Sequence, residues 1–124
     1  MRELMLVAAG GAIGAASRWA IGGWVADRLG PGFPWHTMVV NLSGALLIGV
    51  LMGASVDRAL ISSDWRTFLG TGVLGGYTTF STLAFETTRL LEQGFYGQAT
   101  LNMVGSGVLG VVAAVAGLAV GRML

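Results

Sequence analysis

The run from Gly72 to Thr82, Gly-Val-Leu-Gly-Gly-Tyr-Thr-Thr-Phe-Ser-Thr, holds the residues of this chain that are best suited to binding an ion. It lies in the middle of a long apolar segment, and two adjacent glycines followed by hydroxyl residues weaken a helix. Backbone groups that leave the helical ladder inside a membrane find no water there. They must face protein, an ion or a water-filled cavity. The run therefore predicts a broken helix with a functional role.

Two charged side chains also lie within apolar segments, where they are costly unless they face protein or water. Arg18 is about 21 Å along a helix from Leu4, and it can either attract anions to a pore mouth or reach back to the membrane surface. Glu86 is the acid that lies well inside a segment. It is a candidate for proton coupling, with pairing to Arg89 or Arg18 as the alternative.

Uncharged hydrogen-bonding side chains complete this polar interior, and residues four apart share a helix face. The set consists of Thr37, Asn41, Thr79, Ser81, Thr82, Asn102 and Ser106. Phe80 and Leu83 also share a face, and a phenylalanine ring has a positive edge that can meet an anion. Each hydroxyl or amide can instead bond to its own or a neighbouring helix. A lining of neutral donors can replace the hydration shell of a small anion or pass a neutral polar solute.

The elements that must position these residues are four apolar segments separated by short polar connectors. The chain is 54% hydrophobic and 10% charged, against roughly 25% charged residues in a soluble domain. Segments at about 4–26, 37–56, 67–89 and 98–121 each have the length of about 20 residues that crosses a bilayer. An N-terminal signal peptide is the weaker interpretation, because the first segment continues past Arg18. We expect one all-α transmembrane domain over residues 1–124, with a broken third helix.

Charge and residue counts limit the possible functions. The absence of cysteine excludes thiolate metal sites, and a single histidine, His36, is too few for a His-based metal cluster, which argues against a metalloenzyme and makes an enzyme improbable. All seven basic residues are arginines, and the two predicted membrane faces differ by only two of them: Arg2, Arg58, Arg66 and Arg122 against Arg28 and Arg89, with Arg18 inside the first segment. So small a bias sets orientation poorly and permits an antiparallel homodimer. Glycine pairs at four-residue spacing indicate close helix packing in every segment.

Three blocks of this sequence resemble the Fluc/CrcB fluoride channels of microbial membranes. The blocks are Gly10 to Trp19 with its arginine, Thr37 to Gly44 around Asn41, and Gly72 to Thr82. Their order and spacing match the family over all four segments. The resemblance implies a passive, fluoride-selective channel that exports fluoride through the cell membrane, the inner or plasma membrane, as a multi-pass protein.

The resemblance also implies an antiparallel dual-topology homodimer with two fluoride pores and a central structural sodium ion. Backbone carbonyls of Gly75 and Thr78 correspond to the sodium ligands. Asn41, Phe80 and Ser106 correspond to pore residues, with Arg18 at the vestibule and Glu86 near the pathway. The hydroxyls of Thr37, Thr79, Ser81 and Thr82 are secondary candidates.

The chain departs from the family pattern at Leu83, where a second phenylalanine is usual, and along the fourth segment at Asn102 and Gly110. Three explanations stay open: conduction with Phe80 alone, conduction with altered rate or selectivity, or pairing with a different chain. Two other classes of function compete with a channel. A small multidrug-type proton-coupled exporter predicts an acid in the first segment, where this chain has Arg18. An accessory membrane protein predicts that Asn41 and Phe80 tolerate substitution.

Overall fold

The computed structural model describes residues 1–124, and all of its regular structure is helical. The first helix is α1 (Arg2–Leu29), and the second is α2 (Trp35–Met52) with its π-helical continuation η1 (Gly53–Asp57). A third course consists of α3 (Ser63–Arg66), the π-helical η2 (Thr67–Leu74), α4 (Gly75–Tyr77) and α5 (Phe80–Glu92). The last consists of α6 (Tyr96–Thr100), the π-helical η3 (Leu101–Gly105) and α7 (Ser106–Met123).

Three of these helices are long and apolar enough to cross a membrane: Arg2–Leu29, Trp35–Asp57 and Tyr96–Met123. They contain the predicted segments 4–26, 37–56 and 98–121 and extend each of them by a few residues. Many large apolar side chains on these helices are exposed, for example Val111 and Val115 on α7 at 66% and 61%. Exposed apolar surface of this extent suits lipid, so the prediction of an all-α membrane protein is confirmed.

The predicted segment 67–89 is interrupted, as expected, after Tyr77. Thr78 and Thr79 have extended backbones, with φ, ψ angles of −83°, 157° and −149°, 118°. Thr79 then caps α5, because its hydroxyl oxygen accepts a hydrogen bond from the Thr82 amide at 3.3 Å. The weak helix propensity of Gly75 and Gly76 and the capping hydroxyl of Thr79 together explain why the helix stops and restarts at this point.

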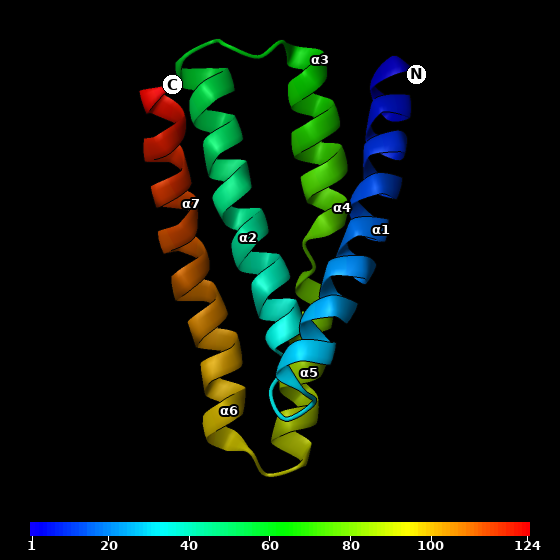
Figure 1. The fold of residues 1–124 in the computed structure, drawn as a ribbon, viewed down its shortest axis with the longest axis vertical. Helices are drawn as coiled ribbons and strands as arrows, with labels where there is room; N and C mark the ends of the chain where they lie inside the picture. The colour runs from blue at the N-terminus through cyan, green and yellow to red at the C-terminus, as the bar shows by residue number, and fades with distance from the viewer.

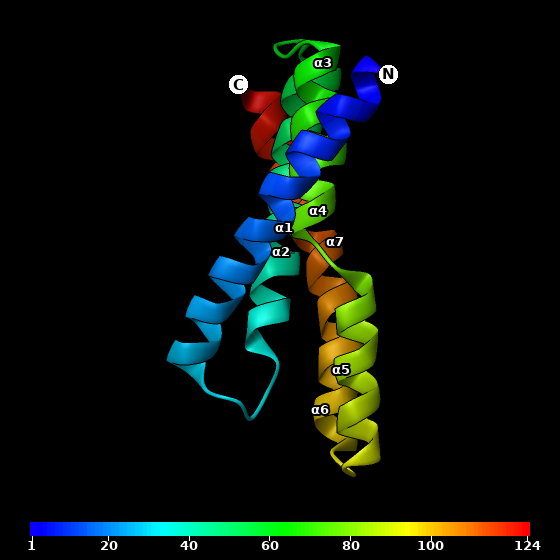
Figure 2. The ribbon, with the colours of Figure 1, turned by 90° about the vertical axis from the view of Figure 1, so that its right-hand side faces the viewer.

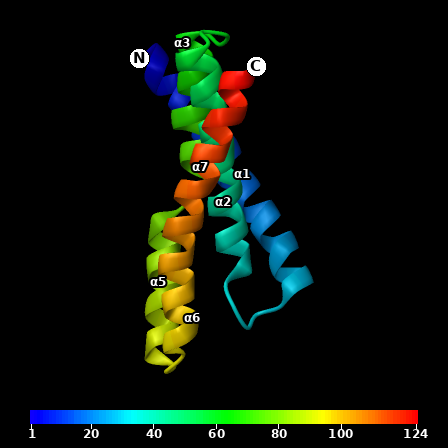
Figure 3. The same cartoon turned by 90° about the vertical axis from the view of Figure 1, so that its left-hand side faces the viewer.

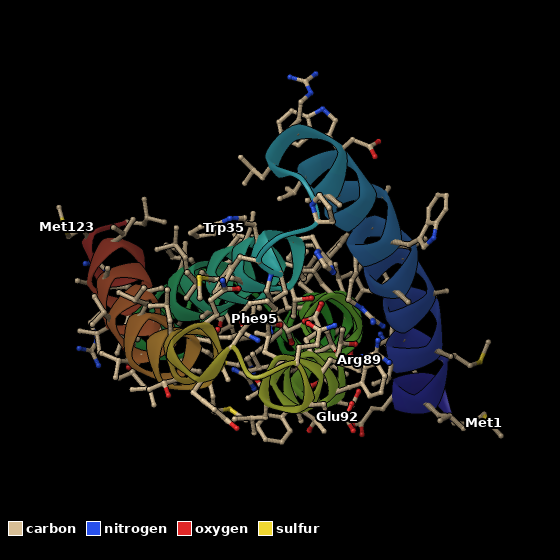
Figure 4. The ribbon with its side chains drawn as sticks, turned by 90° about the horizontal axis from the view of Figure 1, so that it is seen from below. Met1, Trp35, Arg89, Glu92, Phe95 and Met123 are labelled. Atoms are coloured by element: carbon tan, nitrogen blue, oxygen red, sulfur yellow. The ribbon has the colours of Figure 1, made fainter.

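The chain ends and the connector 58–62 lie at one end of the molecule, and connectors 30–34 and 93–95 lie at the other (Figure 1). Over the upper half of the molecule α7, α2, the α3–α4 segment and α1 lie side by side in one row (Figure 1). Over the lower half, α1 and α2 diverge from α5 and α6, which Figures 2 and 3 show from opposite sides. Seen from below, α1 is steeply tilted against the other helices (Figure 4). The break at Thr78 and Thr79 lies where the two groups of helices separate.

The glycine pairs explain which helices pack together. A Cβ atom at Gly14 of α1 would overlap the Val73 carbonyl oxygen of η2, and one at Gly76 would lie 2.6 Å from the Gly11 carbonyl oxygen. A Cβ at Gly49 of α2 would likewise overlap the Ala114 carbonyl oxygen of α7. The pairs therefore meet in two interfaces: Gly10 and Gly14 against Gly72 and Gly76, and Gly49 and Gly53 against Gly117 and Gly121. Both interfaces bring backbones into direct contact.

Candidate functional site

The side chain of Asn41 on α2 holds the backbone of the helix break. Its amide nitrogen donates to the Thr79 carbonyl oxygen at 2.9 Å, and its amide oxygen accepts from the Thr79 N–H at 2.8 Å. Thr79 is extended, so neither group has a helical partner, and Asn41 supplies both. Asn41 thus stabilises the break in addition to lining the space beside it. One of its two N–H groups remains available for another acceptor.

Arg18 on α1 reaches the other side of the same break. Its Nε donates to the Gly76 carbonyl oxygen at 3.2 Å. The positive charge of the guanidinium group therefore lies against the freed end of α4, where the helix dipole is negative. This contact identifies a protein partner for Arg18, so the side chain does not simply extend to the membrane surface.

The carbonyl groups predicted to hold sodium are released from the helical hydrogen-bond ladder. The regular partner of the Gly75 carbonyl is the Thr79 N–H, which donates to Asn41 instead. The Thr78 carbonyl accepts no hydrogen bond. Two backbone oxygens without helical partners suit a hard cation that takes oxygen ligands, so these residues fit the sodium ion that the resemblance implies.

A cavity of about 470 Å³ adjoins the break, and we call it the break cavity. It brings together most of the predicted site residues: Asn41, Gly75, Thr78, Thr79, Phe80, Leu83 and Ser106. The Ser106 hydroxyl is buried and has no hydrogen-bond partner, which leaves it free to donate into this space. Phe80 has 74% of its surface exposed, whereas Leu83 has 7%, so the two share a cavity but differ in accessibility.

A second cavity, of about 260 Å³, lies on the other side of Thr79, and we call it the arginine cavity. Its lining includes Arg18, His36, Thr37, Thr79 and Thr82. The Thr79 hydroxyl donates to the Thr82 hydroxyl at 3.1 Å and lies 3.3 Å from that of Ser81. Because Thr79 lines both cavities, the break separates a neutral, mainly apolar space from one that contains a positive charge.

Glu86 on α5 binds α2 and neither of the two arginines that we considered as partners. One oxygen, Oε2, accepts hydrogen bonds from the Thr37 hydroxyl at 3.0 Å and lies 2.9 Å from Nε2 of His36. The interpretation of Glu86 as the partner of Arg18 or Arg89 is therefore wrong. The reason is that the first turn of α2 contacts α5, so His36 and Thr37 reach the carboxylate.

Asn102 lines neither cavity. It is completely buried, and its amide nitrogen donates to the Thr87 hydroxyl at 3.2 Å, which in turn donates to the Leu83 carbonyl at 2.8 Å. These bonds connect the last helical course to α5. The amide oxygen of Asn102 has no donor. A place for Asn102 on an anion path stays a prediction, while Ser106, one turn further, does reach the break cavity.

Sequence reasoning missed three residues that complete the site. His36 pairs with Glu86, Thr87 connects Asn102 to α5, and the Tyr77 hydroxyl lies 2.9 Å from that of Ser43 on α2. Only His36 carried a usable signal, because it precedes Thr37 and faces connector 30–34 at the start of α2. The partners of Tyr77 and Thr87 are set by helix packing and have no local pattern.

Comparison with known proteins supports the resemblance over the whole chain. A family model described as CrcB-like protein, Camphor Resistance (CrcB), matches residues 5–118. A Thermus thermophilus protein named fluoride-specific ion channel FluC is 48% identical, covering 100% of this chain and 97% of the relative. Proteins of the same name from Agrobacterium fabrum and Geobacter sulfurreducens are 44% and 41% identical, covering 100% of this chain and 99% and 100% of the relatives. The chain therefore belongs to the CrcB family.

Proposed function

We propose that this chain forms a passive, fluoride-selective channel that releases fluoride from the cell down its electrochemical gradient. The observation that carries the proposal is its full-length identity of 41–48% to proteins named fluoride-specific ion channels. These relatives are channels and not enzymes, in agreement with the expectation from composition. The break cavity adds a physical reason, because it joins uncharged donors to a helix break.

Donors with a free hydrogen supply the ion contacts in this proposal. The Ser106 hydroxyl has no other partner, and Asn41 retains one N–H after binding Thr79. The exposed ring of Phe80 offers its positive edge to the same cavity. Neutral donors can replace the water around fluoride without binding it so strongly that it stays. On the other side of Thr79, the charge of Arg18 raises the local concentration of anions.

We further propose that two copies assemble in antiparallel orientation, with α3 to α5 serving as a fourth, broken membrane span in each. In each chain α1 and α2 diverge from α5 and α6 (Figures 2 and 3). Phe80 at the start of α5 is 74% exposed, and so large an exposed ring beside the break favours a partner chain. Each dimer would then contain two pores in a cell membrane, with the break of each chain near the dimer centre.

The carbonyl groups of Gly75 and Thr78 would hold a sodium ion at that centre. When bound, sodium would supply a fixed positive charge between the helix breaks of the two chains. Asn41 binds Thr79 and Arg18 binds Gly76, and these contacts hold the break in the conformation that leaves the carbonyl groups of Gly75 and Thr78 without helical partners. Replacing sodium by N-methylglucamine on both sides of the membrane is expected to abolish fluoride flux, and unchanged flux would contradict this role.

The alternative of a small multidrug-type exporter receives no support from the site. Such a transporter predicts an acid in the first span, whereas α1 presents Arg18, whose Nε is bound to the Gly76 carbonyl. The buried acid that the chain does have, Glu86, lies on α5 and is bound by two donors from α2.

Fluoride efflux from liposomes tests the proposal. Purified protein reconstituted into vesicles loaded with potassium fluoride is expected to release fluoride to an ion-selective electrode, and vesicles loaded with chloride are expected to retain it. Phe80→Ile and Asn41→Asp should reduce the efflux, whereas Phe85→Ile should not, because Phe85 is exposed on the same helix but lines neither cavity. Wild-type vesicles that retain fluoride would refute the function.

A further inference from the structure

A cluster of one imidazole, one carboxylate and one hydroxyl joins the start of α2 to α5. Oε2 of Glu86 lies 2.9 Å from Nε2 of His36 and accepts a hydrogen bond from the Thr37 hydroxyl at 3.0 Å. His36 and Thr37 both line the arginine cavity, at the end of the molecule that carries connector 30–34. The charge of this cluster therefore acts on the cavity in which Arg18 attracts anions.

The two charged members of the cluster differ in their access to water. The side chain of Glu86 is 16% exposed, and its other oxygen, Oε1, is buried without any hydrogen-bond donor. The side chain of His36 is 39% exposed. The carboxylate is thus more sheltered than the imidazole that pairs with it.

Few other ionisable groups act on this pair. From α1, Arg18 lines the same cavity but has its Nε on the Gly76 carbonyl. On α5 itself, Arg89 follows Glu86 by one turn and is exposed. Asp27 and Arg28 are also exposed, at the end of α1 that connector 30–34 joins to the start of α2, and they follow Ala26 of the cavity lining. The adjoining last course contains no ionisable residue between positions 97 and 121. His36 is therefore the one imidazole among the ionisable groups near this carboxylate.

We propose that His36 sets the charge at the entrance of the arginine cavity through Glu86, so that anion conduction increases when the imidazole is protonated. This inference rests on the proposed function. Imidazole is the side chain that ordinarily changes charge between pH 5 and 8. A neutral imidazole leaves the negative charge of Glu86 uncompensated, which repels an approaching anion. A protonated imidazole cancels that charge and leaves the field of Arg18 unopposed.

Single-channel fluoride currents in planar bilayers between pH 5.5 and 8.0 test the inference. The wild-type current at pH 5.5 is expected to exceed that at pH 8.0 by roughly tenfold, the lower end of the range for electrostatic focusing of a charged ligand. His36→Gln retains a donor for Glu86 but cannot be protonated, so its current should stay at the low, alkaline level at every pH. His36→Lys carries a permanent charge and should stay at the high, acidic level.

The currents of these two variants are thus expected to mark the lower and upper limits of the wild-type current. Each variant is first checked for correct folding by a single symmetrical peak in size-exclusion chromatography. Hydrogen fluoride is uncharged, so its permeation through the bilayer carries no current and does not contribute to the recording. A wild-type current that is constant over this pH range would overturn the inference and leave the proposed function intact. A His36→Gln variant that keeps the wild-type pH profile would do the same. A wild type with no fluoride current at any pH would overturn the proposed function and, with it, this inference.

Discussion

Replacing Asn41 by alanine tests whether this side chain holds the helix break or merely lines the cavity beside it. The change removes two hydrogen bonds, of 2.9 and 2.8 Å, and leaves the amide and the carbonyl of Thr79 without partners. A typical hydrogen bond contributes about 1 kcal/mol net, and an unpaired buried group costs about 1–3 kcal/mol. Because Thr79 is only half-buried, we expect the lower part of the range for two unpaired groups, about 2–4 kcal/mol.

Two measurements together check this expectation. Unfolding in mixed detergent micelles gives the free energy of unfolding, and hydrogen–deuterium exchange of the segment 78–82 reports on the break itself. Since 1.4 kcal/mol corresponds to a factor of ten, a loss of about 2 kcal/mol should accelerate exchange of the Thr79 amide by roughly thirtyfold. Leu47→Ala is the matched control, because Leu47 lies on the same helix and is 50% exposed.

If Asn41→Ala changes the free energy of unfolding by less than about 0.5 kcal/mol, the usual limit for an inconsequential surface substitution, Asn41 does not stabilise the break. Unchanged exchange at Thr79 would lead to the same conclusion. Loss of fluoride flux with both quantities unchanged would then assign Asn41 to ion contact alone.

Further predictions concern helix packing and the buried amide. Gly14→Ala should destabilise the protein by at least about 1–3 kcal/mol, the usual cost of overpacking, because the new methyl group meets the backbone of η2. Gly23→Ala is the control and should be neutral, because no atom lies within 4 Å of the added methyl group. Equal melting temperatures of the two variants would contradict this prediction. Thr87→Val should cost about 1–3 kcal/mol by removing the one partner of the buried Asn102 amide, whereas Asn102→Leu should cost less because no polar group is left unpaired. The reverse order in an unfolding titration would show that the amide bond is not the important contact.

Several features could be predicted from the residues because each depends on neighbours in the chain. The interruption near Gly75 and Gly76 follows from low helix propensity and a following cap, and the membrane spans follow from unbroken apolar runs. Such properties are local, so a linear pattern contains them. The resemblance to the fluoride channels also came from short blocks of residues in the correct order.

The contacts that complete the site were decided by tertiary structure. Asn41 and Thr79 are 38 positions apart, and no spacing rule indicates that the amide would bind both backbone groups of the break. The partner of Glu86 was predicted wrongly, because only Arg18 and Arg89 were considered and the contact of α2 with α5 brings His36 to the carboxylate instead.

The glycine pairs show most clearly where sequence information ends. Every span contains such a pair, so the pattern predicts close packing but is the same for every combination of helices. The folded chain selects α1 with η2 and α4, and α2 with α7, because backbones can approach only where glycines face each other at the same depth. That choice places Asn41 and Arg18 on opposite sides of the break. The residues alone indicate that a helix must break and which polar groups can bind the freed backbone. The packing of the helices selects which of those groups hold the break.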